Sequence, residues 1–164
     1  MYQHQCPTIL PNVKATNAAI ARYNALGLLI KFTRVTSGGN IVIKPAPLGA
    51  SYLASAGFPT DGGNPYNRVL INNTYLGSCG SSTRTSIVAH EMGHCIGFRH
   101  TDYKNRSYSC GGSAVNDGAG TVGAKLIPGT PSGPRAGSWM LACISCGEDR
   151  PFTSYDKIAL NYLY

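Results

Sequence analysis

The sequence predicts an α+β fold with two lobes, the first built from strands and helices and the second irregular except for a closing helix. Residues 13–72 alternate between helix-like and strand-like patterns of apolar residues. Residues 111–137 contain eight glycines and three prolines, a composition typical of loops. Because 164 residues with 43% hydrophobic content can bury a core, we expect a single domain over 1–164, with lobes at about 1–97 and 98–164.

The N-terminal lobe is expected to begin with a short strand and a helix, which further short strands follow. Apolar side chains recur at close to helical spacing over 13–26, and Gly27 is a natural end for that helix. Apolar runs bounded by turn-forming residues predict strands at 2–10, 28–35, 41–44, 52–58 and 68–72. Of these, we expect the strand at 52–58 to lie at the edge of the sheet.

Two further helices are predicted downstream. Ser81 and Ser82 offer an N-cap for a longer helix that ends near Gly97. Its buried stripe is expected to comprise Ile87, Val88, Met92, Cys95 and Ile96. Thr153 and Asp156 have the spacing of a capping box and predict the closing helix. The apolar side of that helix is expected to comprise Tyr155, Ile158, Ala159 and Tyr162.

A cluster of histidines on the longer predicted helix is the most informative feature of the chain. His90 and His94 are four residues apart, so on a helix they share one face and can bind the same metal ion. Gly97 can adopt a positive φ and turn the chain back, which allows His100 to supply a third ligand. Glu91 lies about 100° round the helix from His90, beside the metal. The short His-Glu-x-x-His fragment alone also fits a surface ion pair, but Gly97 and His100 favour a metal site.

Three histidine ligands predict a catalytic zinc ion. They leave a fourth position open to water, whereas structural zinc sites use four protein ligands, usually including cysteines. Zinc lowers the pKa of a bound water and stabilises an oxyanion, and Glu91 can accept the proton of that water. We therefore expect one Zn²⁺ ion bound by His90, His94 and His100, with Glu91 as the catalytic base of peptide hydrolysis. Calcium is not expected, because Asp61 and Asn64 do not have the spacing of a calcium-binding loop.

The composition argues against several classes of protein. The net charge is +7, but no two of the 14 Lys and Arg residues are adjacent and none forms a run interleaved with aromatic residues, so we expect no nucleic-acid partner. No apolar run reaches the roughly 18–20 residues of a membrane span. The N-terminus lacks the pattern of a signal peptide, so we expect any export segment of a secreted protein to have been removed.

The even number of cysteines favours an oxidising compartment and therefore a secreted or extracellular protein with up to three disulfides, whose pairing stays open. The six are Cys6, Cys79, Cys95, Cys110, Cys143 and Cys146. Cys143 and Cys146 form a CxxC pair, for which a redox role or a second zinc site is the less favoured interpretation. Cys95 is expected to be a buried thiol or a disulfide partner. Cys6 can alternatively occupy the open zinc position as a latency switch.

The string His90-Glu-x-x-His94-x-x-Gly97-x-x-His100 resembles the metzincin clan of zinc endopeptidases, and several stretches are similar to the bacterial dual-action HEIGH metallopeptidases. These stretches are HEMGHCIGFRHTD at 90–102, NRSYSCGG at 105–112, IPGTPSGPRAGSWMLAC at 127–143 and DKIALNYLY at 156–164. The resemblance covers most of residues 66–164 and, more loosely, 13–35. Met92 replaces the isoleucine of the name-giving motif, a conservative change.

The resemblance implies a metzincin-like fold, with a twisted, mostly parallel sheet, an antiparallel edge strand and two helices in the N-terminal lobe. It also implies a methionine turn beneath the metal, for which Met140 is the candidate, the alternative being ordinary core packing. Asp102 matches an acidic residue of the family and is expected to anchor the lower loop or to bond a ligand imidazole. Some metzincins have a tyrosine where this chain has Ala142, so Tyr103 and Tyr108 are speculative substitutes.

These observations lead to two functional hypotheses. The first is a zinc metalloendopeptidase that binds a peptide or protein substrate in extended conformation, with Gly97, Asp102 and Met140 supporting the site. The alternative is a zinc-loaded peptide-binding protein without turnover, or a latent form held by Cys6 on zinc. The carboxylate of Glu91 favours the first, because binding alone does not require it. We expect a monomer.

Overall fold

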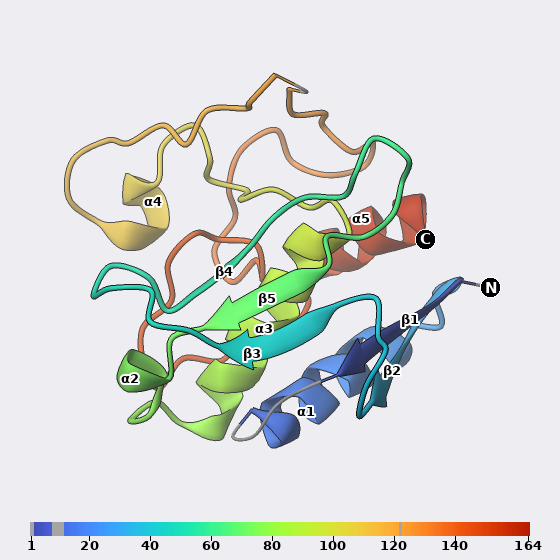
Figure 1. Ribbon diagram of the computed structural model, residues 1–164. Helices are drawn as coiled ribbons and strands as arrows, with labels where there is room; N and C mark the ends of the chain where they lie inside the picture. Colours follow the sequence, from blue (N-terminus) through green and yellow to red (C-terminus); the bar gives the residue numbers. More distant parts are fainter. Residues whose placement is uncertain (1, 8–11, 122) are drawn as a thin grey trace.

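Short strands form two small sheets that lie side by side in the computed structural model, which describes residues 2–7 (backbone only), 12–121 and 123–164 (Figure 1). In the first sheet, β1 (Tyr2–Pro7) pairs in parallel with β2 (Ile30–Val35). In the second, β5 (Arg68–Ile71) pairs in parallel with β3 (Val42–Pro45) and antiparallel with β4 (Ala54–Ala56). Contacts between β1 and β3 join the two sheets. The predicted mostly parallel arrangement with an antiparallel edge strand is therefore confirmed.

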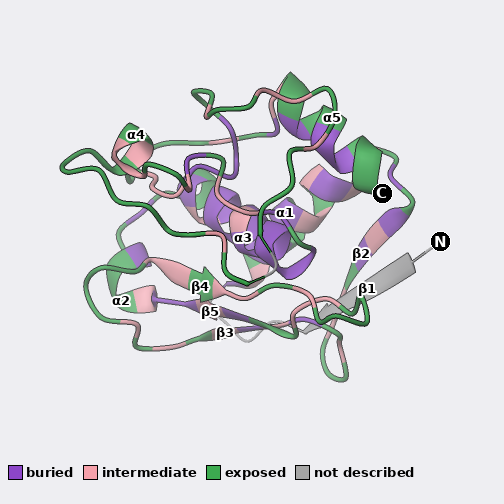
Figure 2. Cartoon of the chain, turned by 90° about the horizontal axis from the view of Figure 1, so that it is seen from above, coloured by how far each residue is buried: buried purple, intermediate pink, exposed green. Residues whose placement is uncertain are grey.

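Two long helices cover one face of these strands (Figures 1 and 2). Helix α1 (Val13–Asn24) packs against β2 and against α3 (Ser81–Cys95), and α3 in turn contacts β4 and β5. Figure 2 shows that most of α3 is buried. The predicted buried stripe of α3 is confirmed, since its members are all buried: Ile87, Val88, Met92, Cys95 and Ile96. Through the hydrophobic effect, burial of these side chains holds α3 in the centre of the molecule.

The ends of the helices differ from the predictions at two points. Helix α1 ends at Asn24, two residues before the end of the predicted helix at 13–26. The side-chain amide of Asn24 donates to the carbonyl of Phe32 (2.8 Å) and accepts from the Phe32 N–H (3.0 Å), so the end of the helix is fixed to β2. The prediction that Ser81 or Ser82 caps α3 is wrong, because Gly80 occupies the N-cap position and no side chain caps the helix.

The chain after α3 consists mainly of loops, as predicted, and disulfides fix these loops in place. These loops contain the short helix α4 (Ser107–Cys110) and end in the closing helix α5 (Ser154–Leu163), whereas the short helix α2 (Asn73–Leu76) lies before α3. Among the described residues, the disulfides are Cys79–Cys146 and Cys110–Cys143. The CxxC pair is thus divided between two different disulfides, so it is not a dithiol site. Cys95 is buried in α3, and the side chain of Cys6 lies outside the described residues.

Helix α5 begins with the predicted capping box but buries a different face from the one predicted. Tyr155, Ile158 and Tyr162 are 44, 42 and 59% exposed, whereas Asp156, Ala159 and Leu160 are buried, so only Ala159 was assigned correctly. The reason is the carboxylate of Asp156. It accepts from the hydroxyl and N–H of Thr153 (2.7 and 2.8 Å), from the Ser138 hydroxyl (2.8 Å) and from the Trp139 N–H (3.2 Å), which turns this side of α5 inward.

None of the helices among the described residues has the length and apolar character that crossing a membrane requires. The two disulfides are typical of proteins that fold outside the reducing cytosol.

The substitution Asp156→Ala is expected to lower the free energy of unfolding by about 3 kcal/mol, because it leaves several buried donors without an acceptor. Chemical denaturation of the variant and the wild type measures this difference. The neighbouring exposed residue provides the control, since Lys157→Ala should change the stability by less than about 0.5 kcal/mol. Equal stabilities for the Asp156 variant and the wild type would contradict the anchoring role of this carboxylate.

Candidate metal centre

The structure brings the three predicted histidines together at one point. His90 and His94 lie on the same face of α3, and the chain turns back at Gly97, whose φ is +109°, to bring His100 beside them. The Nε2 atom of His100 is 3.2 Å from the Nε2 atoms of both His90 and His94. Among the described residues, these histidines form the only cluster that can hold a metal ion. Gly97 thus has the positive φ of a residue at which the chain can reverse.

Each ring is oriented by a bond from its other nitrogen. Nδ1 of His90 donates to the carbonyl of Trp139 (2.8 Å), and Nδ1 of His94 donates to the carbonyl of Phe98 (2.7 Å). Nδ1 of His100 lies 2.8 Å from the carboxylate of Asp117. Because these oxygens are acceptors, the proton of each neutral ring resides on Nδ1, and the Nε2 lone pairs face one another.

This donor set fits a tetrahedral cation. An ion with metal–nitrogen bonds of about 2.1 Å holds two ligand nitrogens roughly 3.4 Å apart, close to the 3.2 Å from His100 to each of the other two. All three nitrogens lie within 4.8 Å of one another. Burial lowers the pKa of His94 to about 4, and burial together with the neighbouring imidazoles holds the pKa of His90 well below its usual value. Both rings are therefore neutral near pH 7, the protonation state that binds metal.

Asp117, which the sequence did not identify as a site residue, bonds the His100 imidazole. An imidazole bond was one of the two roles expected of Asp102. The Oδ2 atom of Asp117 bonds His100, its Oδ1 atom accepts from Arg106 (3.2 Å), and its backbone N–H donates to Tyr103. The only available signal was that Asp117 is the one acidic residue in the glycine-rich stretch 111–137. Such a carboxylate fixes the tautomer and orientation of a ligand histidine.

Asp102 instead performs the other function that the resemblance allowed, because it anchors a loop. Its carboxylate is buried and accepts from the Ser109 hydroxyl (2.6 Å) and from the Ala142 N–H (3.0 Å). It thus links the chain just after His100 to the segment that follows Met140. Among the described residues, the carboxylate of Asp102 bonds Ser109 and Ala142 and no histidine ring, so the imidazole contact is not made by this residue.

The turn at residues 138–140 packs directly against the helix that carries two of the histidines. A Cβ atom added to Gly93 would lie 2.8 Å from Sδ of Met140 and 3.0 Å from Nε1 of Trp139, so the turn requires glycine at this position of α3. Met140 is fully buried and its carbonyl accepts from the Thr101 N–H (2.9 Å). The turn therefore contacts α3 between His90 and His94.

Glu91 faces a cleft beside the histidines. Its side chain is 6% exposed and its carboxylate accepts a backbone hydrogen bond from Ala56 in β4, while Oε2 has no partner among the described residues. Burial raises the pKa of Glu91 to about 8. A carboxylate oxygen is costly to bury without a partner, so this atom is available to a water molecule or a ligand.

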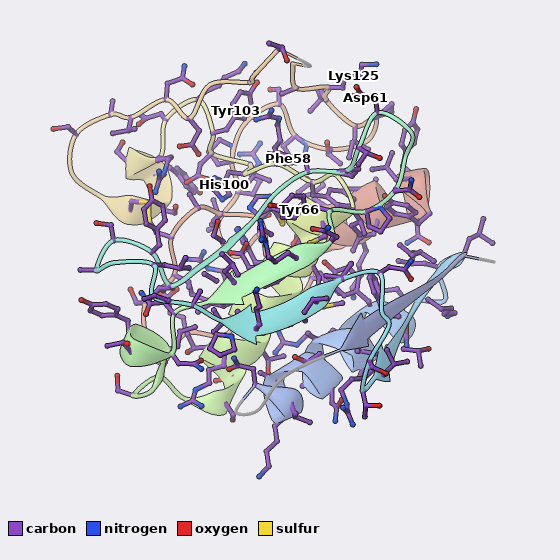
Figure 3. The ribbon with its side chains drawn as sticks, viewed as in Figure 1. Phe58, Asp61, Tyr66, His100, Tyr103 and Lys125 are labelled. Atoms are coloured by element: carbon purple, nitrogen blue, oxygen red, sulfur yellow. A yellow bond between two sulfur atoms is a disulfide. The ribbon has the colours of Figure 1, made fainter. Side chains whose placement is uncertain are left out.

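The cleft has a volume of about 370 Å³ and runs between the edge strand and the turn beneath the histidines. Its lining includes residues 51–56, which contain β4, and also Trp139 and residues 141–144. A second cavity of about 250 Å³ continues past His94 and His100 to Phe58 and Tyr103. Figure 3 labels Phe58, His100 and Tyr103, which all line this second cavity and lie close to one another. Of the two speculative tyrosines, Tyr103 lines this cavity, whereas Tyr108 lines neither and is half exposed.

A fold that gathers three imidazoles able to hold a metal ion and a buried glutamate in one cleft is typical of metallopeptidases. The family model of the dual-action HEIGH metallo-peptidases matches residues 9–164, so the chain belongs to this family. It is thus a metallopeptidase, which implies a bound metal and peptide or protein substrates.

The fold has a relative among the solved structures. The structure of myroilysin matches with a TM-score of 0.59 and 15% sequence identity, over 99% of this chain and 80% of that chain. At this identity the likeness concerns the fold alone, and it confirms the metzincin-like α+β fold expected from the sequence. A comparison with curated proteins finds no match.

The substitution Asp117→Ala is expected to weaken zinc binding by roughly 10- to 100-fold, because His100 loses the carboxylate that orients its ring. Competitive titration against a chromogenic chelator measures the affinity, with far-UV circular dichroism to confirm folding. Asp61→Ala removes an exposed carboxylate from another loop and should leave the affinity unchanged. Identical affinities for the Asp117 variant and the wild type would refute the role of Asp117.

Proposed function

We propose that this chain is a secreted zinc endopeptidase whose residues 1–164 form a single, monomeric catalytic domain. The observation that carries this proposal is the convergence of three Nε2 lone pairs beside the unpartnered carboxylate oxygen of Glu91, within one cleft. A site for storage or structure does not require that carboxylate, whereas hydrolysis of an amide does.

His90, His94 and His100 would hold the zinc ion, with the fourth position open to the cleft. When bound, zinc supplies Lewis acidity to the water and to the substrate carbonyl. The residues of the chain perform the other functions. Asp117 and the carbonyl groups of Trp139 and Phe98 hold the histidine rings in place, so that the ligand set changes little during turnover.

Glu91 is the general base in this proposal, acting in its ionised form. Burial raises the pKa of Glu91 to about 8, and a cation held by the three histidines would lower this pKa again because the cation attracts the carboxylate. The Oε2 atom of Glu91 takes a proton from the attacking water and then gives that proton to the amine that leaves. The bond from the Ala56 N–H to the carboxylate keeps the side chain directed into the cleft during both steps. Because the cleft excludes most solvent around Glu91, the proton is exchanged with the substrate and not with bulk water.

The substrate would lie extended along β4. This strand has a partner on one side only among the described strands, so its other edge can form main-chain hydrogen bonds with a peptide. Because β4 also supplies the Ala56 N–H to Glu91, a peptide on this edge passes directly in front of the general base. Pairing along a strand edge uses the main chain of an extended segment and requires no chain terminus, which favours cleavage within a protein over removal of terminal residues.

Two anchors are proposed to support the site from below. The turn around Met140 supports the histidines through its contact with α3, which makes it the methionine turn in this proposal. Asp102 fixes the loop between His100 and Ala142. The disulfides Cys79–Cys146 and Cys110–Cys143 support the proposed secretion.

The substitution Glu91→Gln should reduce kcat/KM by at least about 1,000-fold while zinc remains bound, because the general base is removed but every ligand is kept. Metal analysis and digestion of a peptide library by both proteins test this expectation. Asp61→Asn makes the same chemical change on an exposed loop and should leave both quantities unchanged. A comparable loss of zinc in the Glu91 variant would contradict its assigned role.

A strong chelator is expected to abolish cleavage, and stoichiometric zinc should restore it. Circular dichroism during chelation separates loss of catalysis from loss of fold. If the zinc-loaded wild type binds peptides but cleaves none of them, the chain is a peptide-binding protein and the proposal fails.

A further inference from the structure

We propose that Arg150 gives this peptidase a preference for substrates with an aspartate or glutamate close to the bond that is cleaved. The inference rests on the proposed function and adds the chemical class of substrate that the cleft selects. It follows from the position of one guanidinium group, from how it is held, and from the charges around it.

Arg150 lies in the wall of the same cleft as Glu91 and the histidines. The neighbouring part of that wall is formed by Ser86 and Ile87 of α3 and by the segment 141–144. Ser86 precedes His90 by one helical turn, so this part of the cleft is adjacent to the metal centre. A substrate side chain next to the scissile bond can therefore reach Arg150.

The backbone of Arg150 is fixed on α3. Its N–H donates to Ser86 Oγ (2.8 Å), and its carbonyl accepts from Arg22 Nη1 (3.4 Å). Ser86 Oγ in turn donates to Asp149 Oδ1 (2.7 Å), which also accepts from Arg22 (2.6 Å). The nearby Cys79–Cys146 disulfide holds the preceding residues. Arg150 is thus presented to the cleft from a rigid support, which reduces the entropy lost when it binds a ligand.

Most of the hydrogen-bonding capacity of the Arg150 side chain remains unused. Of its five N–H donors, the described contacts use only Nη2, which lies 3.1 Å from Oε2 of Glu148. The Arg150 side chain is 13% exposed, whereas that of Glu148 is 47% exposed and screened by solvent. None of the Arg150 nitrogens is both fully buried and without a partner, so the remaining donors are turned toward accessible space. A carboxylate can bind such a guanidinium in a bidentate manner.

The charges along the cleft favour the same class of substrate. Besides the three histidines, the charged residues that line it are Glu91, Arg106 and Arg150. Arg106 is already neutralised by Asp117 (3.2 Å), so Arg150 is the cation of the cleft with unused donors. An acidic side chain near Arg150 therefore meets a cation with spare donors, while a lysine or arginine side chain would meet like charge.

The simplest competing interpretation is that Arg150 only stabilises its loop through Glu148. In that case its substitution would lower the melting temperature and leave the pattern of cleavage unchanged. The two interpretations are separable because selectivity is a ratio of rates for two substrates on the same enzyme, in which a loss of folded protein cancels.

The test begins with digestion of a peptide library by the zinc-loaded wild type. We expect aspartate and glutamate to be enriched at one position within two residues of the cleaved bond. Two peptides that differ only by glutamate or glutamine at that position are then compared. The wild type should favour the glutamate peptide in kcat/KM by roughly tenfold or more, and high ionic strength should reduce this ratio.

The variants assign the preference to Arg150. Arg150→Gln should bring the ratio for the two peptides close to one, and Arg150→Glu should invert the preference toward a lysine peptide. Arg135→Gln removes the same charge from an exposed position outside both cavities and should keep the wild-type ratio. Melting temperatures show whether each variant is folded, and the wild-type ratio tests the preference even if a variant does not fold.

Two outcomes overturn the inference for different reasons. If the wild type cleaves proteins but shows no acidic preference, or if Arg150→Gln retains it, the role of Arg150 is refuted and the proposed function stands. If the zinc-loaded wild type cleaves nothing, the proposed function fails and this inference fails with it.

Discussion

The orientation of three imidazole rings by the bonds to their Nδ1 atoms is the constraint on which the rest of the site depends. Two of these bonds use backbone carbonyls, and the third uses the carboxylate of Asp117. Each bond commits the proton to the outer nitrogen, so the inner lone pairs meet without a proton to separate them. A cation bound by the three Nε2 atoms would relieve the repulsion between their lone pairs, whereas a change of tautomer would break one of the Nδ1 hydrogen bonds.

The supports of the rings come from parts of the chain that are distant in sequence. The backbone of Trp139 shows the connection most directly, because the Trp139 carbonyl accepts from His90 while the Trp139 N–H donates to Asp156 at the start of α5. The last helix of the chain is thereby linked to the first metal-binding residue through one turn. Burial of the charged Asp156 at that point explains why α5 leaves apolar residues such as Tyr162 on the surface.

The parts of the fold and site that depend on local patterns could be predicted from the sequence. The spacing of His90, His94 and His100 places the rings together through helix geometry and one turn, and the capping box of α5 is equally local. Asp117 and the carbonyl of Trp139 could not be predicted in the same way. They reach the rings through loops whose course is set by tertiary contacts and disulfides, and no periodic pattern in the sequence records those contacts.

The disulfide Cys110–Cys143 also has a topological consequence for an enzyme that attacks polypeptides. It brackets the glycine-rich loops, which are the part of this chain that a neighbouring copy could most easily cut. A single nick anywhere between the two cysteines leaves both fragments covalently joined, with Asp117 still tethered on one of them. Autolysis there would open a loop without releasing either half of the molecule.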